Sequence, residues 1–355
     1  MSNDQADVSA KLAAPYQGPS SAVVVLLAQD EQEHVTLFGD RAVAQPCAPE
    51  DVVFEVGSIT KVFTALLLAR LTVDGDIDPN RPIGESCPAF SGAPASLTPR
   101  RLASHTSGLP RLHVPMWKAV IGGVGADPYA DFDRDDLVAW VRDWRPSQPP
   151  HETSHAYSNL GFGLLGEVLA VSLGRPYPDL LQEKVLEPLG LNDTAIALTD
   201  DQRKRFAQPR ATSGKPVVPW TFQAIAGAGA LRSTARDLAR FSGQVAAAMD
   251  TPTTPIARAI ASTAQPVVGL GPKGDMQPMA QCLGWLAMVL DPSAPRVLFH
   301  DGGTAGSTSA LYVCPQKRAA IVILANRGVA AGLLSNLKLM WSNLHGVASD
   351  HFASL

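Results

Sequence analysis

The apolar and polar positions of this chain predict strands near both ends and helices in the middle. Residues 21–29 form an apolar run of strand length, and residues 34–38 supply a partner strand across a polar turn. In the C-terminal third, alternation or short apolar runs predict four further strands, at 281–290, 296–299, 309–313 and 319–325.

Helical periodicity dominates between these two groups of strands. The apolar run at 58–72 predicts a helix that is buried on all sides. A capping pattern at Thr234 and Asp237 marks the start of a helix over 234–249. Further helices are predicted at 134–144, 161–173, 177–189 and 332–344.

This order of elements indicates an α+β fold, an α/β sandwich in which helices flank an antiparallel sheet. The N- and C-terminal strands would form the sheet within residues 1–75 and 222–355. Residues 76–221 would form a mainly helical insert. We expect the active site in the groove between the sheet region and the insert.

Composition narrows the possible partners. The chain has 355 residues, of which 46% are hydrophobic and 17% charged, as in an ordinary globular protein. Its net charge of −4 and the lack of a Lys/Arg cluster argue against nucleic acid as a partner. The early apolar run at 22–28 is too short to span a membrane. The N-terminus is polar and acidic, unlike a secretory signal, so we expect a cytoplasmic protein, or a periplasmic one if a leader was removed.

The strongest candidate chemistry lies where the predicted buried helix begins. Ser58 follows Gly57 at the first turn, where free N–H groups and the helix dipole favour negative charge. Lys61 shares a helix face with Ser58, and burial should lower the pKa of its amine. A neutral amine beside a serine hydroxyl is a general base beside a nucleophile. The same Ser-x-x-Lys spacing at 335–338 lacks the glycine turn, and we interpret it as a solvated helix face.

Two further motifs carry candidate site residues. Tyr157 and Asn159 lie at a helix entrance, where a phenol can transfer a proton and an amide can hold a substrate carbonyl. The alternative is a packing tyrosine beside a capping asparagine. His300 and Asp301 end a predicted strand, and the glycines after them, Gly302 and Gly303, permit close backbone approach to a ligand. The alternative there is an ordinary Asp-Gly turn.

A possible metal motif carries less weight. His151 and His155 match the His-Glu-x-x-His pattern of zinc proteases, which requires a helix and a third ligand. Two prolines precede this segment, which is polar, and no third ligand is evident. We therefore do not expect a zinc site at this segment.

Taken together and in this order, Ser58-x-x-Lys61, Tyr157-x-Asn159 and the motif at 300–302 resemble those of the serine β-lactamase and penicillin-binding-protein superfamily. The resemblance is greatest to its class C-like branch, which includes esterases, D-amino-acid peptidases, amidases and transacylases. It extends from about residue 20 to about residue 330, with further agreement in the segments 102–110, 229–238 and 283–285.

The resemblance implies a role for each motif residue. Ser58 would be the nucleophile that forms an acyl-enzyme, and Lys61 and Tyr157 would share the work of general base and acid. Asn159 would help to hold the substrate and Lys61. The backbone N–H groups of Ser58 and Gly303 would form the oxyanion hole. The resemblance implies neither a metal nor a cofactor.

The chain departs from β-lactamases at His300, where those enzymes carry a lysine that binds the substrate carboxylate. A neutral histidine weakens that recognition, and Asp301 would add negative charge beside it. We therefore expect a hydrolase of a small ester or amide. A D-amino-acid peptidase or amidase and a transacylase are alternatives, and a true β-lactamase is disfavoured. A catalytically silent ligand-binding homologue is an alternative of another class.

Overall fold

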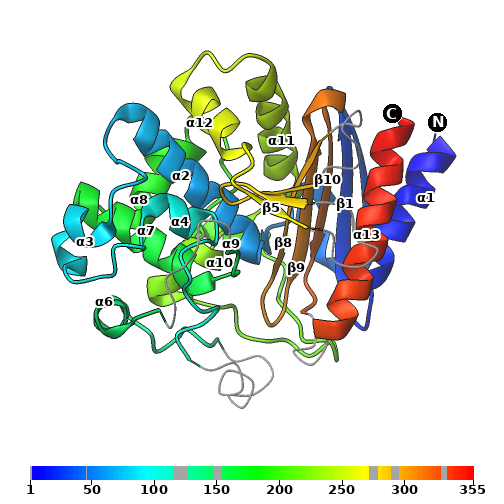
Figure 1. The fold of residues 1–355 in the computed structure, drawn as a ribbon. Helices are drawn as coiled ribbons and strands as arrows, with labels where there is room; N and C mark the ends of the chain where they lie inside the picture. Colours follow the sequence, from blue (N-terminus) through cyan, green and yellow to red (C-terminus); the bar gives the residue numbers. More distant parts are fainter. Residues whose placement is uncertain are drawn as a thin grey trace.

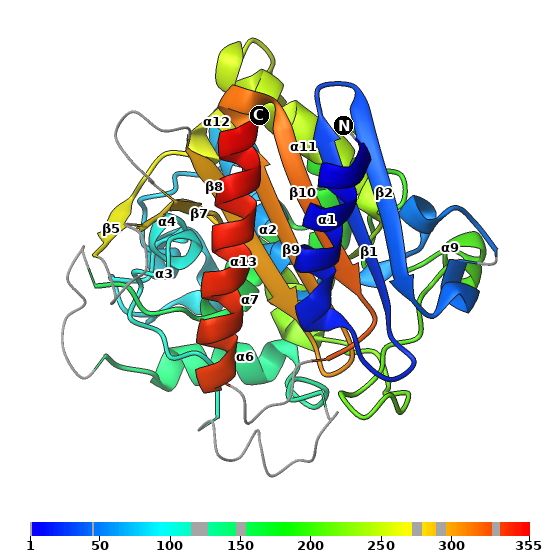
Figure 2. The same cartoon turned by 90° about the vertical axis from the view of Figure 1, so that its right-hand side faces the viewer.

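A central sheet lies between two layers of helices (Figure 1) in the computed structural model of the protein. The structure describes residues 2–44, 46–114, 127–146, 154–271, 279–288, 296–328 and 334–355. Helices α1 (Ser2–Ala13) and α13 (Leu334–Ser354) lie side by side on one face of the sheet, with the chain termini at the same end (Figure 2). The other labelled helices lie on the opposite side of the sheet (Figure 1).

The sheet is antiparallel and has the strand order β2-β1-β10-β9-β8-β7-β6-β5. In that order the strands are β2 (Gln32–Gly39), β1 (Ala22–Gln29), β10 (Ala319–Ala325), β9 (Thr308–Cys314), β8 (Val297–Gly303), β7 (Leu286–Met288), β6 (Met279–Gln281) and β5 (Val268–Leu270). The N-terminal β1 pairs with the C-terminal β10, with Val25 opposite Ile323. The predicted antiparallel sheet built from both ends of the chain is confirmed.

The two faces of the sheet explain why β1 is apolar almost throughout. Val24 and Leu26 pack into the larger core with the helices on the side opposite α1 and α13. Val23 and Val25 point the other way, into a smaller core beneath α1 and α13. A strand that is covered on both faces needs apolar residues at every position rather than at alternate positions.

The helices on the side opposite α1 and α13 begin with α2 (Thr60–Asp74), whose end is capped by Gly75 at φ 84°. Strands β3 (Phe54–Glu55) and β4 (Arg232–Ser233) pair beside it. The other helices are α3 (Ile83–Ser86), α4 (Pro99–Ala103), α6 (Arg134–Asp143), α7 (Asn159–Leu173), α8 (Tyr177–Leu181), α9 (Asp200–Lys204), α10 (Ala226–Gly229), α11 (Ala235–Asp250) and α12 (Pro255–Thr263).

Several predicted boundaries were wrong. The predicted strand at 281–290 is two strands, because the chain turns between β6 and β7 at Gly284, where φ is +74°; residues 289–290 lie outside the described residues. The predicted helix at 177–189 is α8 followed by a π-helical turn, Gln182–Leu186. The strand predicted at 296–299 continues as β8 to Gly303, so the third motif lies within a strand.

Within 76–221, the described residues form helices and loops and no named strand. The division into a sheet region and a helical insert remains a prediction. Among the helices that the structure describes, none combines the length and the apolar character that a membrane span requires.

Candidate active site

The fold brings the first two motifs into direct contact. Ser58 lies in a 3₁₀ turn, Gly57–Ile59, immediately before α2, and Lys61 is in the first turn of that helix. Tyr157 lies in the segment that precedes α7. Ser58 Oγ lies 2.8 Å from Lys61 Nζ, and the Tyr157 hydroxyl donates to it at 2.9 Å. A hydroxyl, an amine and a phenol therefore meet at one point.

Two glycines let strand β8 approach the Ser58 turn closely. A Cβ on Gly57, where φ is +50°, would lie 2.6 Å from the backbone nitrogen of Gly303. A Cβ on Gly302 would lie 2.0 Å from the Val56 carbonyl oxygen and 2.9 Å from the Ser58 nitrogen. The backbones of Ser58 and Gly303 are therefore neighbours, as an oxyanion hole built from their N–H groups requires.

Lys61 is fully buried in an apolar helix. Burial lowers the pKa of its amine well below 10.5, and the positive charge of Arg111 lowers it further. Its Nζ donates to the Ala228 carbonyl oxygen at 2.7 Å. A neutral amine held within hydrogen-bond distance of the Ser58 hydroxyl suits a general base.

Tyr157 has the opposite protonation tendency. Burial raises the pKa of its phenol to about 12, so the hydroxyl keeps its proton at neutral pH. The Tyr157 ring packs on the His105 ring, with the centroids 4.4 Å apart. His105 Nδ1 accepts from the Ser158 N–H at 3.0 Å, which ties it to the same segment. Sequence reasoning missed this supporting role, although 102–110 was among the family-like segments.

Asn159 is the first residue of α7 and lies beside this cluster. Its Nδ2 donates to the Tyr129 hydroxyl at 2.8 Å. Its buried Oδ1 has no hydrogen-bond partner among the described residues, and the expected contact with Lys61 is not formed. This oxygen is an acceptor without a donor, which a substrate N–H could satisfy.

Strand β8 directs His300 and Asp301 to opposite faces of the sheet. His300 shares a face with Gly302, which abuts Ser58. Burial, with the nearby Lys61, lowers the pKa of His300 to about 3, so the ring is neutral. Asp301 projects toward the smaller core, where its charge adds to burial in raising the pKa of Tyr16. Its charge nevertheless acts to raise the pKa of Lys61 and of Tyr157, so the expectation that Asp301 adds negative charge near the substrate stays a prediction.

Glu55 is a buried carboxylate that sequence reasoning missed; its position three residues before Ser58 was the available signal. Its Oε2 accepts from the hydroxyls of Thr304 at 2.7 Å and Ser307 at 3.2 Å, in the turn that follows β8. Its Oε1 accepts from the Trp220 N–H at 3.0 Å. Glu55 thereby fixes the turn that adjoins Gly303, which is one end of the predicted oxyanion hole.

A sequence profile of the beta-lactamase family matches residues 10–339. The chain belongs to the beta-lactamase family. Within the serine β-lactamase and penicillin-binding-protein superfamily it lies in the class C-like branch, which confirms the predicted resemblance. The family and the fold identify it as a serine hydrolase of the β-lactamase and penicillin-binding-protein type.

Three relatives show how far the similarity extends. The D-alanyl-D-alanine-carboxypeptidase/endopeptidase AmpH of Escherichia coli K12 is 26% identical over 328 residues, which cover 88% of this chain and 81% of AmpH. Penicillin-binding protein 4 of Amycolatopsis lactamdurans is 27% identical over 81% of this chain and 75% of its own length. The crystal structure of a class C β-lactamase from Rhodobacter sphaeroides matches with a TM-score of 0.77 and 25% identity, covering 97% of this chain and 99% of that one.

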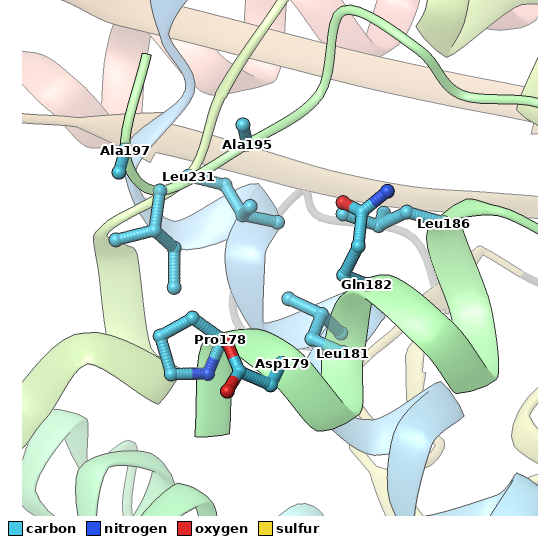
Figure 3. Close-up of a pocket in the computed structure, with 9 residues that line it drawn as sticks. Pro178, Asp179, Leu181, Gln182, Leu186, Ala195, Ala197 and Leu231 are labelled. Atoms are coloured by element: carbon cyan, nitrogen blue, oxygen red, sulfur yellow. The ribbon is translucent and has the colours of Figure 1, made fainter. Parts of the chain in front are cut away.

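This β-lactamase-family chain also has a surface hollow away from the Ser58 cluster (Figure 3). The hollow has a volume of about 190 Å³, and none of the predicted site residues lines it. It is formed by α8, the π-helical turn after it, and the neighbouring segments, with the lining residues Pro178, Asp179, Leu181, Gln182, Leu186, Ala195, Ile196, Ala197 and Leu231.

The possible zinc motif falls mostly outside the described part of the chain, because residues 151–153 are not described. His155 Nε2 lies 3.0 Å from Gln281 Oε1, in a contact with an amide rather than with an acidic ligand. Among the described residues, no cluster of three His, Cys, Asp or Glu side chains could hold a metal ion.

Proposed function

We propose that this β-lactamase-family hydrolase acts through an acyl-Ser58 intermediate on small esters or amides, with esters favoured. One observation carries the proposal. Ser58 Oγ lies 2.8 Å from an amine whose pKa is lowered and 2.9 Å from a phenol whose pKa is raised. A base and an acid therefore flank the nucleophile in the protonation states that acyl transfer needs.

Acylation follows from these positions. The Lys61 amine takes the proton of the Ser58 hydroxyl while Oγ attacks the substrate carbonyl carbon. The backbone N–H groups of Ser58 and Gly303 stabilise the oxyanion that forms. Tyr157 gives its proton to the leaving oxygen or nitrogen, and the Lys61 ammonium restores the phenol proton. The products are the acyl-Ser58 ester and a released alcohol or amine.

Deacylation uses the same groups in reverse roles. A water molecule attacks the acyl carbon, and its proton passes to the basic pair formed by Lys61 and Tyr157. Ser58 Oγ leaves and regains a proton, which regenerates the free hydroxyl. If an alcohol or an amine replaces water in this step, the same site performs acyl transfer.

His300 supports the preference for esters over β-lactams. Its imidazole stands where a β-lactamase carries a lysine, and its pKa of about 3 leaves it uncharged at neutral pH. The strand side of the cleft therefore lacks the cation that binds a β-lactam carboxylate. Activated esters need no such contact, because their leaving groups depart readily once the tetrahedral intermediate forms.

Amide or D-peptide hydrolysis is the second candidate function. The buried Asn159 Oδ1 has no hydrogen-bond partner in the part of the chain that the structure describes, and it would accept a hydrogen bond from a substrate amide N–H. The similarity to AmpH, which is named as a D-alanyl-D-alanine carboxypeptidase and endopeptidase, supports the same activity.

Intact-protein mass spectrometry tests the proposal after incubation with 4-nitrophenyl acetate and, in parallel, with nitrocefin. We expect ester turnover, an acyl adduct on Ser58 and little nitrocefin hydrolysis. Ser58→Ala should lose the adduct and the turnover. Ser335→Ala, which alters the second Ser-x-x-Lys sequence, is the matched control and should retain both. Undiminished turnover by a pure Ser58→Ala sample would disprove the nucleophile assignment, and fast nitrocefin hydrolysis would indicate a β-lactamase.

A further inference from the structure

Arg111 places a positive charge beside Tyr157. The residue directly follows the segment 102–110, and its guanidinium carbon lies 4.9 Å from the centroid of the Tyr157 ring. Its backbone carbonyl accepts from the N–H groups of Asn159 at 3.1 Å and Leu160 at 3.4 Å. The start of α7, which carries Asn159, therefore fixes the backbone position of Arg111.

Arg111 has no ion-pair partner within the described part of the protein, and Asp301 interacts with its charge only at longer range. The residue is exposed, and its guanidinium forms no ion pair or side-chain hydrogen bond with the described residues. By contrast, Arg205 binds Asp193 at 2.6 Å and Asp201 at 2.9 Å. The contact with the Tyr157 ring involves no oxygen acceptor, so the N–H donors of the guanidinium remain available for an anion.

Arg111 is also close enough to influence the reacting groups. Its charge contributes to the lowered pKa of Lys61 and opposes the burial that raises the pKa of Tyr157. Lys61 and His300 both favour their neutral forms. A guanidinium stays charged at neutral pH, so Arg111 is the cation that the described residues of this cluster offer to a substrate.

We propose that Arg111 selects esters or amides that carry a carboxylate, which it binds on the helical side of the cleft. The inference rests on the proposed acyl-Ser58 function. The β-lactamase cation belongs to the strand, at the position of His300, whereas Arg111 adjoins Tyr157 and α7. A carboxylate held by Arg111 therefore lies on the side of Tyr157 rather than on the side of β8.

The net charge of the protein makes a preference for anionic substrates informative about Arg111. The protein carries a net charge of −4, so its long-range field opposes the approach of an anion. A preference for an anionic substrate over a neutral one of the same size must then come from a local cation. Screening by salt should weaken that preference, because the Debye length falls to about 3 Å at 1 M ionic strength.

Two matched substrate pairs test the inference. Mono-4-nitrophenyl adipate and 4-nitrophenyl hexanoate differ in a carboxylate on the acyl group. 4-Acetoxybenzoate and its methyl ester differ in a carboxylate on the leaving group. The measured quantity is the ratio of kcat/KM for the anionic substrate to that for the neutral one. This ratio cancels any general effect of the substitution on Tyr157, because both substrates share that effect.

For at least one pair, we expect the wild-type protein to prefer the anionic substrate. In the same pair, Arg111→Gln should reduce the ratio of kcat/KM values about tenfold, and by no less than about threefold. Arg41→Gln, which removes an exposed cation in the 3₁₀ turn Arg41–Ala44, makes the same change in net charge and should leave the ratio unchanged. A smaller fall with Arg111→Gln for both pairs, or an equal fall with Arg41→Gln, overturns the inference while ester turnover still supports the proposed function. If no substrate acylates Ser58, the proposed function fails and this inference fails with it.

Discussion

Replacing Glu55 by glutamine tests whether the turn after β8 controls the oxyanion hole. The side chain is 3% exposed, and it accepts three hydrogen bonds. The Trp220 N–H can only donate, so the glutamine oxygen must stay opposite it. The glutamine NH₂ group then faces the hydroxyls of Thr304 and Ser307 in place of a carboxylate oxygen.

The cost follows from the partners of Thr304. Its Oγ1 already accepts from the N–H groups of Gly306 at 3.3 Å and Ser307 at 3.1 Å, so its own proton is directed to Glu55. In Glu55→Gln the glutamine NH₂ group faces the Thr304 hydroxyl proton, so two donors oppose each other. The hydrogen bond from Thr304 to a charged group is lost. Such bonds contribute about 1.5–3 kcal/mol. Burial raises the pKa of Glu55, so removing the charge offsets part of the loss. We expect about 1–3 kcal/mol of destabilisation.

The same substitution should slow acylation. Removing an oxyanion donor entirely costs about 10²–10³-fold in rate. Glu55→Gln keeps the Gly303 N–H but loosens the adjoining turn, so we expect a loss of about tenfold. Urea unfolding measures the stability change, and stopped-flow release of 4-nitrophenol measures acylation well below the unfolding transition.

Asp237→Ala provides the matched control. Asp237 is also a buried carboxylate, and it accepts from the Asp193 N–H and the Thr194 hydroxyl, each at 2.8 Å. Its loss should destabilise the protein to a comparable degree without slowing acylation. If Glu55→Gln and Asp237→Ala slow acylation equally, the effect is one of general stability. Unchanged stability and acylation in Glu55→Gln would refute the reasoning.

Three further substitutions probe the cluster. Lys61→Met should slow acylation by about 10²–10⁴-fold while leaving the thermal midpoint unchanged or higher, because an apolar chain replaces a buried amine; a lowered midpoint with little kinetic loss would make Lys61 structural. The kcat/KM of ester hydrolysis should fall as pH drops below the lowered pKa of Lys61, and His300→Asn should keep that limb, because the pKa of His300, about 3, places its titration below the assay range. Gly302→Ala would place a Cβ 2.0 Å from the Val56 carbonyl oxygen, so circular dichroism and ester assays should show misfolding or lost turnover; a stable, active variant would contradict the close approach.

Sequence reasoning located the strands and the site residues that a short stretch of sequence marks. The apolar runs predicted β1 and β10, and the turn at Gly57 distinguished Ser58 from the serine of the motif at 335–338. The amphipathic helix α12 was missed, and α1 was considered only as a possible export signal. These helices depend on packing against α2 and against the sheet, which no short window of sequence displays.

The missed residues of the site share a different cause. Glu55 and His105 contact residues that are distant in sequence. Glu55 binds Thr304 and His105 packs on Tyr157, and these contacts exist only in the folded chain. The direction of Asp301 depended on the register of β8. Once the strand continued to Gly303, alternation turned the carboxylate away from Ser58. The predicted strand ended at Phe299, which left that direction open.

The electrostatics of the cleft separate catalysis from charge recognition. The fold surrounds the amine of Lys61 with apolar groups and binds it to a carbonyl oxygen, which favours the neutral base before a substrate arrives. The same burial keeps His300 uncharged, so the buried groups that serve catalysis provide no fixed cation. We therefore predict that substitution of the exposed Arg111 changes the preference for charged substrates, whereas substitution of Ser58, Lys61 or Tyr157 changes the chemistry.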